Sequence, residues 1–185
     1  GDIVNNWNEI ARDKKTMLFA VNVKHSQAIV YEFNKFGVQA EHLDAHSDDE
    51  KREATLARFR SGETKIISNV DLYTEGTDIP EIECVSLARP TKSIGRYLQM
   101  VGRGARPYPG KENFLVLDHG KNVAGREDSH GYYEDPIEWS LEGKKISYKK
   151  PVPRDPKKKH KMNCERCRTI FTGDTCPRCG TKIEN

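Results

Sequence analysis

Short runs of hydrophobic residues alternate along the chain with longer segments in which hydrophobic residues recur every three or four positions. The short runs predict buried strands, because a strand of a parallel sheet is covered on both faces. The longer segments predict amphipathic helices that each bury one side. The predicted strands are 17–21, 38–43, 65–70, 84–88 and 113–118, and the predicted helices are 3–15, 25–36, 47–60 and 93–101.

Residues that often begin or end helices mark several of these boundaries. Asp2 is the predicted cap of the first helix, and Gly37 is the predicted stop of the second. Residues 47–50, Ser-Asp-Asp-Glu, fit a capping box, in which the Ser47 and Glu50 side chains bond backbone amides at the helix start. Strands that alternate with helices through short connections predict an α/β fold with a parallel sheet covered on both faces.

The length of 185 residues suits one medium-sized domain and a small appendage. Residues 1–142 carry the alternating pattern, residues 143–163 are rich in Lys and Pro and predict a linker, and residues 164–185 form the appendage. The chain has neither a bilayer-spanning apolar run nor the order of a secretion signal, so we expect a cytoplasmic protein without a membrane partner. It begins with Gly1 rather than Met, and we expect it to be a piece of a longer polypeptide.

Charge is distributed unevenly between the two ends of the chain. Residues 142–185 contain 13 Lys and Arg against 5 Asp and Glu, a net charge of +8, whereas the residues before them contain 18 against 23, a net charge of −5. A basic tail of this kind attracts nucleic-acid phosphates, although a solvated appendage would have the same composition. The tail is therefore a predicted nucleic-acid contact.

Four of the five cysteines lie in the last 22 residues, in two Cys-x-x-Cys pairs formed by Cys164, Cys167, Cys176 and Cys179. Two such turns can bring four thiolates to the tetrahedral arrangement that suits Zn²⁺. Two disulfides are the alternative, but the expected reducing compartment favours zinc. The sequence therefore predicts a zinc ribbon whose metal nucleates its folding, and it leaves Cys84 as a buried free thiol.

Two predicted loops hold polar groups where α/β domains commonly bind ligands, beyond the ends of strands. Residues 72–80 combine Gly76 with hydroxyl and carboxylate groups, and residues 99–107 place Arg103 and Arg106 among small residues. Guanidinium groups suit phosphate oxygens and can stabilise charge in a transition state. An ordinary polar loop and a solvated basic turn at a helix end remain the alternatives.

Both loops resemble motifs of one enzyme family. Residues 99–106, with the pattern Q-x-x-G-R-x-x-R, resemble the sixth motif of superfamily-two helicases, and residues 75–80, Glu-Gly-Thr-Asp-Ile-Pro, resemble the fifth. Residues 17–27 resemble the fourth-motif region. The resemblance covers about residues 17–118 and is to the second RecA-like domain of DEAD/DEAH-type helicases from bacteria and phages, related to restriction-enzyme motor subunits. It implies a parallel RecA-like sheet of the P-loop NTPase type.

The resemblance also implies roles for individual residues. The residues that would face the γ-phosphate of ATP, two of them as arginine fingers, are Gln99, Arg103 and Arg106. Gly76 and Asp78 would lie at the ribose of the nucleotide and couple it to nucleic acid. The residues that would contact nucleic acid are Thr74 and Ser47.

The chain contains neither a G-x-x-x-x-G-K-[ST] loop nor an acidic pair at a strand end that could hold Mg²⁺. The resemblance therefore implies that ATP with Mg is bound mainly by an N-terminal RecA-like domain of the same polypeptide, and that the isolated chain is inactive. We expect the C-terminal half of an ATP-dependent helicase or translocase that acts on DNA, with RNA as the alternative. A stand-alone zinc-ribbon module that binds nucleic acid without an ATPase role is the second interpretation.

Overall fold

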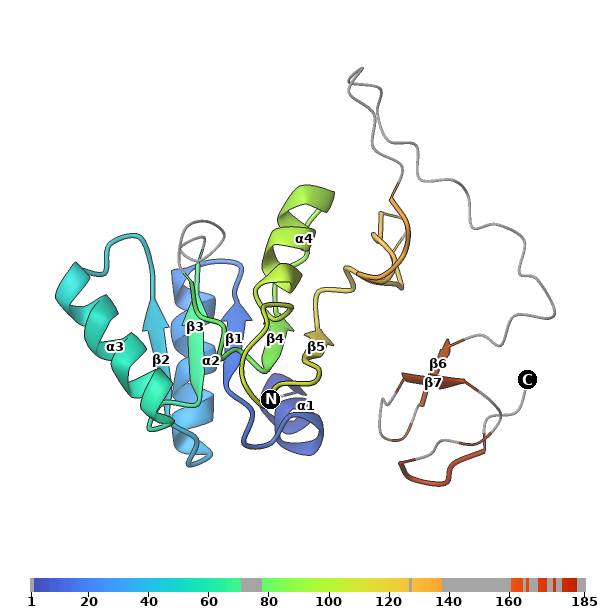
Figure 1. Ribbon diagram of the computed structural model, residues 1–185, viewed down its shortest axis with the longest axis horizontal. Helices are drawn as coiled ribbons and strands as arrows, with labels where there is room; N and C mark the ends of the chain where they lie inside the picture. Colours follow the sequence, from blue (N-terminus) through green and yellow to red (C-terminus); the bar gives the residue numbers. More distant parts are fainter. Residues whose placement is uncertain are drawn as a thin grey trace, which may run out of the picture. The chain divides into compact units, whose positions relative to one another are not determined.

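Figure 1 shows the computed structural model, which describes residues 2–70, 78–126 and 128–137 and, towards the C-terminus, 161–164, 166, 170–172, 175 and 178–182. The chain divides into two compact units, Gly1–Asp135 and Pro136–Asn185. The expected boundary after residue 142 falls outside the described residues and stays a prediction. Among the described residues, no helix has the length and apolar character needed to cross a membrane.

Every strand and helix predicted for the first unit is present, with shorter bounds in most cases. The strands are β1 (Thr16–Phe19), β2 (Ala40–Leu43), β3 (Ile66–Asn69), β4 (Cys84–Leu87) and β5 (Leu115–Asp118). The helices are α1 (Asp2–Ile10), α2 (Val23–Lys35), α3 (Asp49–Ser61) and α4 (Ile94–Gly102). The alternation of apolar runs and amphipathic segments therefore predicted the element order of this unit.

The five strands form one parallel sheet in the order β2-β3-β1-β4-β5. The central strand β1 pairs with both β3 and β4, and Thr16 lies opposite Ile66 on one side and Cys84 on the other. The connection from β3 to β4 therefore passes across β1. The predicted α/β class with a parallel sheet is confirmed, and the arrangement is consistent with a RecA-like domain.

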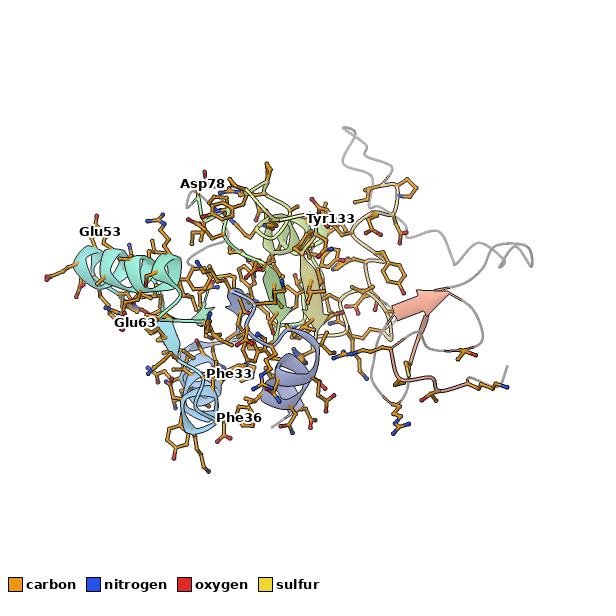
Figure 2. All side chains as sticks on the ribbon, turned by 60° about the horizontal axis from the view of Figure 1, so that its bottom comes forward. Phe33, Phe36, Glu53, Glu63, Asp78 and Tyr133 are labelled. Carbon is orange, nitrogen blue, oxygen red and sulfur yellow. The ribbon has the colours of Figure 1, made fainter. Side chains whose placement is uncertain are left out.

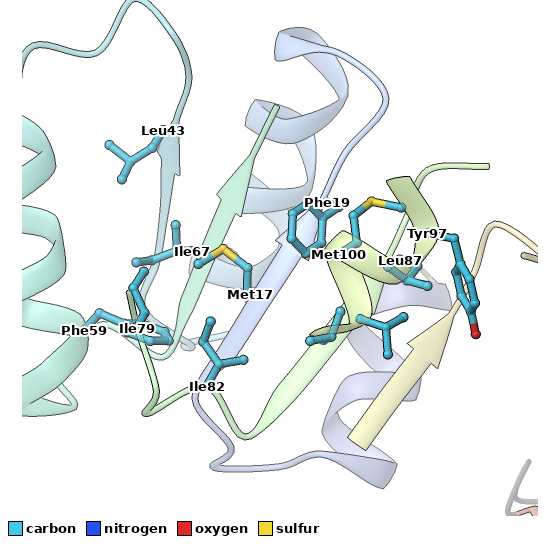
Figure 3. Close-up of a cluster of buried hydrophobic side chains, with 12 residues drawn as sticks. Met17, Phe19, Leu43, Phe59, Ile67, Ile79, Ile82, Leu87, Tyr97 and Met100 are labelled. Atoms are coloured by element: carbon cyan, nitrogen blue, oxygen red, sulfur yellow. The ribbon is translucent and has the colours of Figure 1, made fainter. Parts of the chain in front are cut away.

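Two clusters of apolar side chains cover the two faces of the sheet. On one face, Phe59 of α3 and Met100 of α4 pack with Met17 and Leu87 (Figure 3). On the other face, side chains of α1 and α2 pack with the sheet, and the Trp7 and Phe33 rings meet edge to face with centroids 5.6 Å apart. Burial on both faces explains why the strands read as continuous apolar runs.

Helix α1 ends at Ile10 and not at residue 15 as the hydrophobic spacing predicts. The amide of Lys14 donates to the Ala11 carbonyl in a turn, and Asp13 adopts a left-handed φ of 66°. A left-handed residue cannot continue an α-helix. The turn instead leads the chain directly into β1.

The predicted capping box at the start of α3 is wrong. Asp48 is the cap, and its side chain accepts a hydrogen bond from the Lys51 amide at 2.7 Å. The Ser47 hydroxyl accepts from the Asp44 amide instead, at 3.1 Å. Ser and Asp cap helices about equally well. Asp48 is the cap because the hydroxyl of Ser47 is already bonded to the Asp44 amide in the preceding turn.

In the second unit, β6 (Lys161–Asn163) and β7 (Ile170–Thr172) form an antiparallel pair in which Met162 lies opposite Phe171. A single bridge joins Thr175 to Lys182. Strand β6 occupies the last three residues of the predicted linker, and the described end of the chain is thus a small β structure.

Candidate functional site

The connection that crosses from β3 to β4 is anchored in the core and carries Asp78 at the surface. Ile79 and Ile82 of this connection are buried in the same cluster as Met17. The Asp78 side chain is 76% exposed (Figure 2). The backbone beside Asp78 is therefore fixed, whereas its carboxylate is open to a ligand.

Helix α4 places the beginning of the second motif. The Ser93 hydroxyl caps the helix by accepting from the Arg96 amide at 3.3 Å. Tyr97 and Met100 are buried against the sheet, and Gln99 is exposed. The helix thus uses one side for packing and leaves Gln99 free of the core.

The two arginines of the motif lie in different environments. Arg103 follows α4 directly, is only 7% exposed, and its backbone amide donates to the Met100 carbonyl at 3.3 Å. Arg106 lies three residues further on, and its side chain is 35% exposed. The guanidinium group of Arg106 is consequently the more accessible of the two.

Asp78 and Arg106 form an ion pair between Oδ1 and Nη1. The pair joins the two segments that resemble the fifth and sixth motifs, which are separated by 28 positions in the sequence. A pair with so exposed a carboxylate contributes only about 0–1 kcal/mol to stability. The Arg106 guanidinium can therefore leave Asp78 for a more highly charged partner at little cost.

Gly104 lies between the two arginines at a point where the backbone meets the core. A Cβ atom at this position would lie 2.3 Å from Cδ2 of Phe114 and 2.9 Å from Cγ2 of Val85. These distances are too short for any side chain without movement of its neighbours. Glycine at this position therefore allows the backbone to approach Phe114 and Val85 closely.

The turn between β2 and α3 is built around Asp44. Its Oδ1 accepts from the His46 amide at 2.9 Å and from the Ser47 hydroxyl at 3.3 Å. Burial opposes ionisation, but hydrogen bonds from His42, the His46 amide and Ser47 hold the pKa of the Asp44 carboxyl below its usual value. Ser47, a predicted nucleic-acid contact, is therefore half-buried and bonded within this turn.

A chain of polar side chains supports this turn from three elements and was not predicted. His42 Nδ1 lies 2.7 Å from Ser26 Oγ, and His42 Nε2 lies 3.2 Å from Asp44 Oδ2. Ser26 Oγ lies 2.6 Å from Ser68 Oγ. A serine on the buried side of α2, in its first turn, was the available signal, but its partners lie 16 and 42 positions away.

Asn122 is a second residue that the sequence did not identify. It is fully buried, and its Oδ1 accepts from the Thr91 amide at 2.8 Å. Its Nδ2 donates to the Arg89 carbonyl and to Asp118 Oδ1, both at 3.0 Å. Asn122 therefore ties the turn after β5 to the loop that leads from β4 into α4.

Several predicted site residues lie outside the described part of the chain. They are Thr74, Gly76, Cys167 and Cys176.

The other two cysteines of the predicted zinc ribbon lie close together. Cys164 and Cys179 are free thiols whose sulfur atoms are 3.4 Å apart. This separation is near the roughly 3.8 Å edge of a tetrahedron with Zn–S bonds of about 2.3 Å. Among the described residues, no three potential ligands gather into a metal site. Cys167 and Cys176 lie outside those residues, and the zinc site stays a prediction.

Cys84 is a buried free thiol, as predicted. Burial is the main reason that the pKa of its thiol is raised from 9.0 to about 12, and the Thr16 hydroxyl opposes this shift only in part. The group is therefore a neutral core residue at physiological pH.

Comparison with known proteins identifies the family to which this α/β fold belongs. Residues 2–108 match the family model described as the helicase conserved C-terminal domain. The match covers more than half of the chain, which therefore belongs to this family.

Individual relatives show the same class. The chain is 34% identical over 149 residues to the 51.5 kDa protein of Lactococcus phage (isolate 7-9), with 78% of this chain and 33% of the phage protein covered. It is 29% identical over 142 residues to the pre-mRNA-splicing ATP-dependent RNA helicase Prp28 of Emericella nidulans, with 76% and 16% covered. The chain is thus homologous to ATP-dependent helicases and spans only a minor part of these relatives.

The solved structures show the same fold. Domain 2 of the Mss116p DEAD-box helicase, bound to an RNA duplex, superposes with a TM-score of 0.52 at 24% identity. The superposition covers 66% of this chain and 48% of that one. This likeness supports the RecA-like description of the first unit.

Proposed function

We propose that this chain is the C-terminal half of an ATP-dependent helicase or translocase that acts on DNA. An N-terminal RecA-like domain of the same polypeptide would bind ATP with Mg, which supplies the phosphoryl group to be transferred. Closure of the two domains would bring Arg103 and Arg106 to that group, where their guanidinium charges stabilise the negative charge of the transition state.

The observation that carries this proposal is the ion pair between Asp78 and Arg106. It brings the accessible arginine of one motif to the exposed carboxylate of the other, although the two are distant in sequence. Asp78, with Gly76 before it, would then bind the nucleotide beside the phosphate that Arg106 contacts. The exposed Gln99 would line the same cleft, and the burial of Arg103 would hold its charge in place.

Nucleic-acid binding is assigned to two regions in this proposal. Thr74 and the turn at Ser47 would contact the strand on the motor domain. The tail from residue 142 onward, with its net charge of +8, would add non-specific attraction to phosphates. A zinc ion held by Cys164, Cys167, Cys176 and Cys179 would stabilise the end of this tail in a reducing cytoplasm.

The test is an Arg106→Ala variant of the intact helicase that contains this chain. We expect kcat for ATP hydrolysis to fall by roughly 10³-fold with ATP binding little changed, because an arginine finger acts mainly in the transition state. The matched control is Arg12→Ala, which removes an exposed arginine that follows α1. An unchanged kcat in Arg106→Ala would remove this residue from catalysis and contradict the proposal.

A second measurement concerns the chain by itself. Without the loop and the lysine that cradle phosphates, the purified chain should not hydrolyse ATP. Turnover that persists after contaminating ATPases have been excluded would contradict the division of the site between two domains.

A further inference from the structure

The ammonium group of Lys111 lies between the two segments that carry the proposed nucleotide-facing residues. Its Nζ donates to the Pro80 carbonyl at 3.1 Å and to the Arg106 carbonyl at 2.9 Å. These acceptors precede Lys111 by 31 and 5 positions, respectively. Lys111 itself lies outside both motifs, in the connection between α4 and β5.

The position of Lys111 is set by its own turn. The Lys111 amide donates to the Tyr108 carbonyl at 3.0 Å, and Gly110 adopts a left-handed φ of 78° that permits the turn. The side chain is half-buried. Burial lowers the pKa of its ammonium group, and the carboxylates of Glu83 and Glu81 oppose this shift.

The two carbonyl groups that Lys111 binds lie outside the strands and helices, so no regular ladder holds them together. A hydrogen bond from a charged donor is about twice as strong as one between neutral groups. A second polar link between the described parts of these segments, from Asp78 to Arg106, joins two side chains and ends at an exposed carboxylate. Lys111 differs from this ion pair because it joins the two backbones.

Resting on the proposed function, we propose that Lys111 is a positioning residue for Arg106. It fixes the backbone of Arg106 to that of Pro80, so that the arginine keeps its place when its guanidinium group leaves Asp78 for a phosphate. Lys111 acts on hydrolysis only through Arg106 and does not itself touch the nucleotide.

Accurate placement matters because a shift of about 1 Å in a reacting group can cost on the order of 100-fold in rate. The segment after α4 reaches the core at Gly104, and beyond it Ala105 and Tyr108 are exposed. Losing the Lys111 contacts would therefore move Arg106 without removing its charge.

The experiment compares variants of the intact helicase in steady-state ATP hydrolysis. Lys111→Met keeps much of the apolar stem and removes the donor, and we expect kcat to fall by about 10-fold to 100-fold with KM for ATP little changed. Lys111→Arg keeps a charged donor and should retain most of the activity. Lys35→Met, at an exposed position on α2, is the matched control and should behave like the parent enzyme.

A double-mutant cycle separates positioning from a general structural role. If Lys111 acts through Arg106, Lys111→Met should lower kcat in the parent enzyme but not in the Arg106→Ala background. Equal losses of kcat in both backgrounds would overturn the inference. It would also be overturned if Lys111→Arg lost as much kcat as Lys111→Met and still unfolded at the same temperature as the parent enzyme.

The outcomes distinguish this inference from the proposed function. A normal kcat in Lys111→Met beside a strongly reduced kcat in Arg106→Ala would overturn the role of Lys111 and leave the arginine finger intact. A normal kcat in Arg106→Ala would contradict the proposed function itself. Hydrogen exchange of the isolated chain adds a readout without ATP, and Lys111→Met should speed exchange near residues 104–110 and leave the sheet unchanged. Unchanged exchange there would also count against the role of Lys111.

Discussion

Arg58 on α3 binds both carboxylate oxygens of Glu41 on β2. Arg58 Nε lies 2.9 Å from Oε1, and Nη2 lies 2.6 Å from Oε2. The Thr55 and Thr64 hydroxyls donate to the same carboxylate at 2.9 Å and 2.5 Å. The hydrogen bonds from Arg58 have the largest effect on the pKa of Glu41. Together with the two threonine hydroxyls they lower it from 4.5 to about 2, although burial acts in the opposite direction.

We expect Glu41→Gln to lower the free energy of unfolding by about 2 kcal/mol at pH 7, a value reduced for the partial exposure of the pair. A lowered carboxyl pKa contributes stability that is complete above the unfolded-state pKa near 4.5 and is lost as the pH falls toward 2. Urea unfolding of both proteins between pH 7 and pH 2 measures the difference. A difference that does not shrink in acid would contradict this account, and Glu53→Gln on the outer side of α3 is the control (Figure 2).

Asn122→Ala should destabilise the first unit by about 3 kcal/mol. The substitution leaves the buried Thr91 amide and the Arg89 carbonyl without their partner, and each unpaired group costs about 1–3 kcal/mol. Denaturant unfolding measures the loss, and Asn5→Ala on the exposed side of α1 is the control. A loss below about 1 kcal/mol would show that water replaces the amide at this site.

Metal analysis of the purified chain should find one equivalent of zinc. Replacing Cys176 and Cys179 by Ser should abolish it and leave the cooperative unfolding of the first unit unchanged, because that unit has its own core. Thiol alkylation provides a second readout. In the native protein Cys84 should resist alkylation, since its thiol is buried and its pKa is raised to about 12. Zinc-free chains that carry disulfides after reducing purification would contradict the assignment.

The basic tail should dominate the affinity of the isolated chain for nucleic acid. Each phosphate that the tail neutralises releases counterions, so the logarithm of the binding constant should fall steeply with the logarithm of salt concentration. A chain that ends at residue 141 loses a net charge of +8 and should lose most of that slope. Fluorescence anisotropy with labelled single-stranded DNA measures both. If truncation leaves affinity and slope unchanged, the motor surface alone binds the strand.

The sequence predicted the fold well because the inner strands β1, β3 and β4 are buried throughout and each helix buries one side. Helix ends were harder to predict, since Ser47 and Asp48 are both good caps and a contact with Asp44 determines which one is used. The end of α1 likewise depends on a left-handed Asp13 that no local spacing indicates.

The candidate site was predictable only in part for a similar reason. The spacing of Arg103 and Arg106 is visible in the sequence, but the burial of each arginine depends on residues that are distant in the sequence. The sequence indicated neither that Arg103 is buried and Arg106 paired, nor that Lys111 reaches both segments. Asn122 and His42 were missed because their partners come from other elements.

The contact of Gly104 with Phe114 has an evolutionary consequence. Because an aromatic ring occupies the space of a side chain at position 104, the two positions cannot vary independently. A larger residue at position 104 would require a smaller one at position 114 and would also crowd Val85. Selection on this glycine therefore comes from the core of the domain as well as from the chemistry of its neighbouring arginines.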